Sequence, residues 1–163
     1  MTLFPSQKQS CEFSPDRIYR YVLRRTWDEA KPKVAFIGLN PSTADETTDD
    51  PTIRRCKNYA FAWGYGGLIM GNLFALRATK PKVMMAHTAP IGPENNYWLE
   101  SLARDAEIVI AAWGVSGSHL KRDRVVLGFM PQMRHLGLTK AGMPKHPLYL
   151  KADTKPQIWR PVK

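Results

Sequence analysis

The sequence predicts an α/β fold, a three-layer α/β/α arrangement with a central, mostly parallel sheet of about four strands and an N-terminal edge strand. Apolar runs with the length and β-branched content of strands buried on both faces occur at 34–37, 67–74 and 107–114. Helical patterns separate these runs, and such alternation is typical of parallel sheets. The chain has 163 residues, of which 44% are hydrophobic, so we expect a single domain with a core at about 18–150 and a tail at 151–163.

The N-terminal part is expected to hold two strands and a helix. Residues 20–27 mix aromatic and β-branched side chains with arginine, which indicates a half-exposed strand at a sheet edge, and the central strand at 34–37 follows. A helix should begin at Asp50 and Pro51, because aspartate can cap free backbone amides and proline suits the first helical position, and it should end near Gly64. Its buried face should carry four apolar residues, Ile53, Cys56, Ala60 and Trp63. Three basic residues should lie off that face, namely Arg54, Arg55 and Lys57.

The rest of the chain continues the alternation of strands and helices. Four elements are expected in order, a strand at 67–74, a helix at 95–105, a strand at 107–114 and a helix within 119–133. Leu99 and Leu102 should face inward from the first of these helices because their spacing places them on one side. The tail from Ala152 looks irregular, although Ile158 and Trp159 can pack back onto the core.

Charge and cysteine content bound the partners and the compartment. The 24 Lys and Arg residues outnumber the 14 Asp and Glu residues and give a formal net charge of +10, which favours nucleic acid as a partner but also suits solubility alone. Cys11 and Cys56 fit neither a disulfide framework nor a zinc-ligand spacing, so we expect a cytoplasmic protein with no bound metal and no cofactor. We expect no membrane partner either, because no apolar run approaches the ~20 residues of a membrane span.

Polar residues follow the predicted buried strands at their carboxyl ends, where open α/β sheets bind ligands. The first strand runs into Gly38-Leu39-Asn40-Pro41-Ser42, and the next ends near Asn72, whose amide must find partners or lose roughly 1 to 3 kcal/mol. A later turn carries His146 beside Pro147. Each feature also has a structural interpretation, since Gly and Asn-Pro form common turns, the Asn72 amide can bond local backbone, and an isolated histidine is usually a loop residue. The residues Trp113-Gly114, which also end an apolar strand, are better explained by core packing.

Taken in their order, these strand ends and turns resemble those of the uracil-DNA glycosylase superfamily over about residues 34–149. The motifs that carry the resemblance are a strand ending in Gly-x-Asn-Pro, an apolar strand ending in Asn, one ending in Trp-Gly, and a final His-Pro turn. A closer resemblance is to the group called domain of unknown function 1643. It rests on four segments, Gly-Leu-Asn-Pro-Ser-Thr-Ala-Asp, Asp-Asp-Pro-Thr-Ile-Arg-Arg-Cys, Trp-Gly-Tyr-Gly-Gly-Leu and Asn-Leu-Phe-Ala.

The superfamily resemblance implies a glycosylase-like enzyme that hydrolyses the N-glycosidic bond of a damaged or modified base in DNA, single-stranded DNA included. Asn40 would orient the attacking water, Asn72 would read the base edge, and His146 would donate to a base oxygen as negative charge develops there. The turn residues implied to contact substrate are Gly38, Leu39, Pro41 and Ser42. Phe74 and Tyr65 are the candidates for stacking on the base, although each also fits a place in the core.

Three features depart from the glycosylase pattern. Residues 148–150 look like the start of a strand where those enzymes carry a wedge into the duplex, and Ser42 stands where the mismatch-specific branch has glycine. The loop before the first helix holds four acidic residues, Asp45, Glu46, Asp49 and Asp50. These carboxylates can cap the helix and face solvent, coordinate a cation, or recognise an amino-bearing base.

Two other functions stay open beside the glycosylase. The same fold can serve as a binding module that holds a nucleic acid or nucleotide without cleaving it, or as an enzyme that acts on a free nucleoside or nucleotide. Nicotinamide and nucleoside-triphosphate sites are disfavoured, because the sequence has neither Gly-x-Gly-x-x-Gly after a strand nor a Gly-Lys-Ser/Thr phosphate loop.

Overall fold

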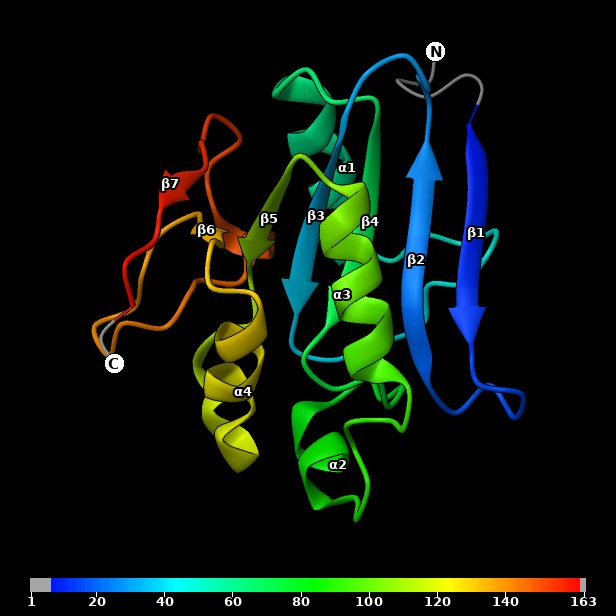
Figure 1. Ribbon diagram of the computed structural model, residues 1–163, viewed down its shortest axis with the longest axis vertical. Coiled ribbons are helices and arrows are strands. Elements are labelled where there is room, and N and C mark those ends of the chain that lie inside the picture. Colours follow the sequence, from blue (N-terminus) through cyan, green and yellow to red (C-terminus); the bar gives the residue numbers. More distant parts are fainter. Residues whose placement is uncertain (1–6, 162–163) are drawn as a thin grey trace.

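One seven-stranded sheet organises the chain, of which the computed structural model describes residues 7–161 (Figure 1). The strands are β1 (Lys8–Phe13), β2 (Arg20–Thr26), β3 (Lys33–Gly38), β4 (Gly67–Asn72), β5 (Ile108–Ala111), β6 (Arg134–His135) and β7 (Gln157–Ile158). The helices are α1 (Pro51–Ala62), α2 (Pro81–Ala86), α3 (Asn95–Asp105) and α4 (Arg122–Phe129), with 3-10 turns η1 (Val115–Lys121) and η2 (Pro147–Tyr149). None of the helices in the described part of the chain is long and apolar enough to cross a membrane.

The sheet is mixed, with the strand order β1-β2-β4-β3-β5-β6-β7. The neighbours β4 and β3, β3 and β5, and β5 and β6 pair in parallel. The pairs β1–β2, β2–β4 and β6–β7 are antiparallel. The predicted α/β class is therefore confirmed, but the sheet is wider than the four strands expected, because antiparallel strands extend it on both sides.

Helices cover both faces of the sheet, because successive residues of a strand point to opposite sides. Phe36 packs in the cluster that includes the buried face of α1, whereas the next residue, Ile37, packs with Leu99 and Leu102 of α3. Figure 1 shows α3 crossing one face, with α1 behind the sheet. A Cβ atom on Gly71 would lie 2.6 Å from a methyl carbon of Leu102, so the absence of a side chain there allows α3 to approach.

The N-terminal elements confirm one prediction and correct another. Helix α1 begins as expected, with Asp50 Oδ1 accepting a hydrogen bond of 2.9 Å from the backbone N–H of Ile53. The prediction that residues 20–27 form an edge strand is wrong, because β2 lies between β1 and β4 and is mostly buried. Its arginines suggested exposure, but Arg20 and Arg25 are both buried inside the fold.

The C-terminal half differs from expectation at three points. Helix α2 forms between the expected strand at 67–74 and the expected helix at 95–105, where no element was predicted. The prediction that a strand starts at 148–150 is wrong, since Pro147 begins the 3-10 turn η2 instead. In the tail, β7 pairs with β6, and Trp159 packs edge-on against Trp113 with ring centroids 5.7 Å apart.

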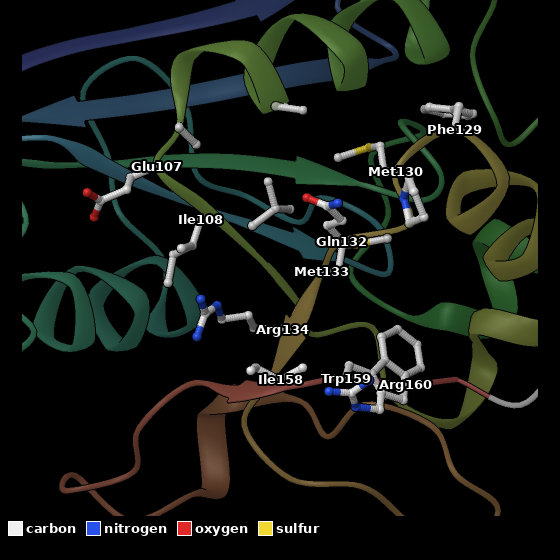
Figure 2. A pocket seen from close by; sticks show the side chains of 14 residues that line it. Glu107, Ile108, Phe129, Met130, Gln132, Met133, Arg134, Ile158, Trp159 and Arg160 are labelled. Atoms are coloured by element: carbon white, nitrogen blue, oxygen red, sulfur yellow. The ribbon is translucent and has the colours of Figure 1, made fainter.

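Cavities occur at opposite ends of the parallel strands. One, of about 530 Å³, opens at the amino ends of β5 and β6. Figure 2 shows Phe129, Met130 and Trp159 among the side chains around it, together with Arg134 and Arg160. None of the residues predicted to form a site lines this cavity.

Candidate active site

A second cavity, of about 580 Å³, lies at the carboxyl ends of β3, β4 and β5. The chain passes from β3 to β4 on one side and later to β5 on the other, and open parallel sheets bind ligands where strand order reverses in this way. The volume is in the usual range for small-molecule sites. The predicted residues that line it are Gly38, Leu39, Asn40, Pro41, Ser42, Asn72 and His146.

Two of the predicted residues, the candidates for base stacking, do not line this cavity. Phe74 is fully buried in the core and contacts the ring of His119 at a centroid distance of 5.4 Å. Tyr65 precedes β4, so it lies at the amino end of the strands, where Trp27 Nε1 donates to its carbonyl oxygen. The aromatic residues that do line the cavity are Trp113, which is buried, and Tyr149, which is 90% exposed on η2.

The amide of Asn40 is held in one orientation by its nitrogen. Nδ2 donates to the carbonyl oxygens of Pro41 at 3.1 Å and Ala78 at 2.8 Å. The amide oxygen accepts no hydrogen bond from the described residues. The side chain is half-buried at the cavity wall, so this oxygen is available to a bound water or ligand.

Asn72 ends β4 directly beside Gly38. A Cβ atom at position 38 would lie 2.7 Å from Asn72 Oδ1, so the ends of β3 and β4 fit together only because position 38 has no side chain. Asn72 is 2% exposed, and its Nδ2 finds no acceptor among the described residues. Leaving a buried donor unpaired costs about 1–3 kcal/mol, and an acceptor on a ligand in the cavity is one way to remove that cost.

The imidazole of His146 is fixed by the turn that follows it. Nδ1 accepts a hydrogen bond of 3.2 Å from the backbone N–H of Leu148. Burial lowers the pKa of His146, and the charge of Asp50 acts in the opposite direction without cancelling the shift. The neutral ring with Nδ1 as acceptor carries its proton on Nε2, so His146 offers the cavity one N–H donor.

Sequence reasoning placed neither Asp50 nor Arg20 in the cavity, yet both line it. Asp50 is 8% exposed, and no ion pair to it occurs within residues 7–161. Arg20 is buried on β2, donates from Nη1 to the carbonyl oxygen of Ala44 at 3.0 Å, and leaves its Nε without a partner. Burial lowers the pKa of Arg20 to about 10. One signal pointed to Asp50, because a helix that follows a strand of a parallel sheet begins at the carboxyl edge.

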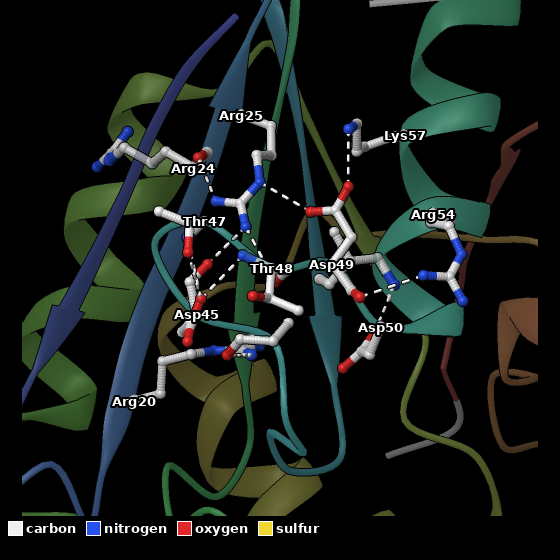
Figure 3. A network of polar contacts seen from close by, with 12 residues as sticks. Arg20, Arg24, Arg25, Asp45, Thr47, Thr48, Asp49, Asp50, Arg54 and Lys57 are labelled. Atoms are coloured by element: carbon white, nitrogen blue, oxygen red, sulfur yellow. Dashed lines mark hydrogen bonds and ion pairs between the residues drawn. The ribbon is translucent and has the colours of Figure 1, made fainter. Parts of the chain in front are cut away.

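The acidic loop is held by ion pairs and turns rather than left open (Figure 3). Asp49 accepts from Arg25 Nε at 2.9 Å and from Lys57 Nζ at 2.8 Å, and both cations are buried. The prediction that Lys57 lies off the buried face of α1 is therefore wrong. Arg25 also donates to the carbonyl oxygens of Asp45 and Thr48. No group of three or more His, Cys, Asp or Glu side chains in the described part of the chain could hold a metal ion.

The family of the chain is shown by sequence comparison. A family model described as "Protein of unknown function (DUF1643)" matches residues 20–148. The chain belongs to this family. The matched span includes four of the residues that line the cavity, Asn40, Asp50, Asn72 and His146. No curated protein and no solved structure matches the chain.

Proposed function

We propose that the cavity binds a damaged or modified base of DNA, single-stranded DNA included, and that the protein hydrolyses the N-glycosidic bond of that base. The observation that carries this proposal is the buried, unpartnered Nδ2 of Asn72 in the same cavity as Asn40 and His146. A primary amide has a donor and an acceptor side by side, which matches the hydrogen-bonding edge of a nucleobase.

The orientation of the other two side chains supports the same chemistry. Glycoside hydrolysis passes through an oxocarbenium-like sugar, so the site must align a water and stabilise charge on the departing base. Asn40 has its nitrogen tied to two carbonyl oxygens and its own oxygen free to align a water. His146 has a neutral ring with an Nε2–H donor, which suits a base oxygen that gains negative charge.

Charge and topology agree with a nucleic-acid partner. The net charge of +10 attracts a polyanion. Lys80 and Lys145 are exposed and are each adjacent in sequence to a residue that lines the cavity, so we assign them to the phosphates on either side of the base. We further infer that the four parallel strands, in the spatial order β4, β3, β5, β6, form a sheet of the uracil-DNA glycosylase type.

Base excision from defined oligonucleotides tests the proposal. Single- and double-stranded DNA carrying uracil, hypoxanthine or a bulky modified pyrimidine would be incubated with the protein, and abasic sites would be measured by strand scission. We expect product with at least one base. The rate should fall by about 10²–10³-fold in His146→Ala, because a donor to the developing charge is lost, and by about 10²-fold in Asn40→Ala, because the water is no longer aligned.

Matched controls separate the cavity from general effects of substitution. His87 is an exposed histidine outside the cavity whose Nδ1 also accepts from the backbone N–H two residues later. Asn58 is an exposed asparagine on α1. His87→Ala and Asn58→Ala should keep the full rate. Binding of the oligonucleotides without abasic product from any base would instead establish a binding module, and would refute the proposed hydrolysis.

A further inference from the structure

The proposed hydrolysis needs a group that accepts the proton of the attacking water. Neither amide in the cavity can do this, because an amide oxygen is a very weak base. The imidazole of His146 has its Nδ1 occupied by the backbone N–H of Leu148 and its Nε2 protonated. Among the residues that line the cavity, Asp50 alone carries a carboxylate.

The position of Asp50 is fixed, and one of its oxygens is unoccupied. Oδ1 accepts the hydrogen bond from Ile53 that caps α1, with the backbone of Asp50 extended. Oδ2 accepts no hydrogen bond from the described residues and does not belong to the buried side-chain atoms that lack a partner. The cap thus fixes the carboxylate through Oδ1 and leaves Oδ2 without a partner, in a residue that lines the cavity.

The charge of Asp50 is not neutralised by an ion pair within residues 7–161. Arg25 and Lys57 pair with Asp49, one residue earlier, and not with Asp50. The charge of Asp50 acts on Arg20 and on His146, two ionisable side chains that line the cavity with it. A carboxylate in this place can both accept a proton and stabilise a positively charged sugar.

We propose that Asp50 is the general base of the reaction, an assignment that rests on the proposed function. The C1′–N bond breaks and its electron pair leaves with the base. The oxygen of a water aligned by Asn40 bonds to C1′ and gives one proton to Asp50 Oδ2. The departing base takes a proton from solvent, Asp50 returns its proton to solvent, and the sum is the consumption of one water.

Asp50→Asn tests the assignment, because asparagine caps helices about as well as aspartate and lacks the charge. Unfolding temperature and oligonucleotide binding, measured by fluorescence anisotropy, should match the wild type. The single-turnover rate of abasic-site formation should fall by about 10²–10⁴-fold. Asp50→Ser also keeps a capping oxygen and leaves room for formate, which should restore part of the lost rate. Glu46→Gln, at a partly exposed position in the same loop whose carboxylate pairs with Arg17, should keep the full rate.

The outcomes separate this assignment from the proposed function. Normal excision by Asp50→Asn overturns the role of Asp50 and leaves the glycosylase proposal standing. A slow variant that has also lost folding or DNA binding, with no rescue of Asp50→Ser by formate, overturns the role as well, because it shows a structural effect. Absence of product from the wild-type protein with every base overturns the proposed function, and the assignment with it.

Discussion

Asp49 and Asp50 are adjacent in the sequence, but their carboxylates have opposite surroundings. Asp49 forms ion pairs with Arg25 and Lys57 on the side of the loop that packs against β2 and α1 (Figure 3). Asp50 forms no ion pair within residues 7–161 and lines the cavity together with Arg20, whose Nε lacks a partner. The anchor of the loop, defined by Arg25, Asp49 and Lys57, is saturated with polar contacts, and the cavity is not.

The anchor and the cavity differ in how their buried polar groups are partnered. A buried charge stays in a fold when it is paired and hydrogen-bonded, and the anchor meets this condition on every side. In the cavity, by contrast, the donors of Asn72 and Arg20 stay unpaired although both residues are buried. Since unpaired buried donors are costly, we interpret the anchor as structural and the cavity as the place where a ligand completes the hydrogen bonding.

Removal of Arg25 should have the largest effect on stability. Arg25 is 0% exposed, and Arg25→Met would leave Asp49 with one cation, the carbonyl oxygen of Asp45 without its donor, and that of Thr48 with the backbone N–H of Asp45 alone. We expect a loss of about 3–5 kcal/mol in the free energy of unfolding, measured by urea denaturation.

Two further arginines on the same strand provide the contrast. Arg24 pairs with Asp105 at the surface, so Arg24→Met should cost less than about 1 kcal/mol. Arg20 is as buried as Arg25 but has one hydrogen bond to Ala44 and no carboxylate partner in the described part of the chain, so Arg20→Met should cost only about 1 kcal/mol. Equal losses in the Arg20 and Arg25 variants would contradict the division into an anchor and a cavity.

The sequence predicted the regular parts of the fold because their signals are local. The cap at Asp50 and the limits of α3 at Asn95 and Asp105 follow from turn chemistry and helical spacing, and both agree with the structure. The burial of β2 depends on contacts distant in the sequence. The charge of Arg25 is paired in the interior by Asp49, which lies in the loop before α1. No local pattern around Arg25 contains that information.

The same limit applies to the candidate site. Asn40, Asn72 and His146 could be placed together because each follows a strand or a marked turn, and strand ends meet at one edge of a parallel sheet. The stacking residues could not be found in this way. Phe74 lies two residues beyond β4, where the direction of a side chain depends on packing against His119 rather than on strand alternation.

Gly38→Ala should have the next largest effect, because it acts on the contact that shapes the cavity. The added Cβ would lie 2.7 Å from Asn72 Oδ1 and 2.9 Å from Met70 Cε. Crowding of this kind costs about 1–3 kcal/mol, and it should also move the Asn72 amide and weaken oligonucleotide binding. Urea denaturation and anisotropy titrations would measure the two effects.

Gly128→Ala is the matched control for that substitution. Gly128 lies within α4, and a Cβ there would meet nothing within 4 Å. Alanine should therefore stabilise the protein by about 0.5–1 kcal/mol, through helix propensity alone, and leave binding unchanged. A Gly38→Ala variant with normal stability and binding would show that the close fit of β3 and β4 does not set the position of Asn72.

The smallest expected effect is the pH dependence of the anchor. Burial raises the pKa of Asp49, but the hydrogen bonds and charges of Lys57 and Arg25 outweigh burial, so the net shift is downward from 3.8. A carboxylate whose pKa is lower in the folded state stabilises the fold above its unfolded pKa and loses that contribution as the pH falls through the folded pKa. The difference in unfolding free energy between wild type and Asp49→Asn should therefore be constant from pH 7 to about pH 5 and shrink below pH 4. Asp153→Asn, at an exposed position, should show no such change; a difference for Asp49→Asn that persists unchanged at pH 3 would mean that shape, and not charge, holds the loop.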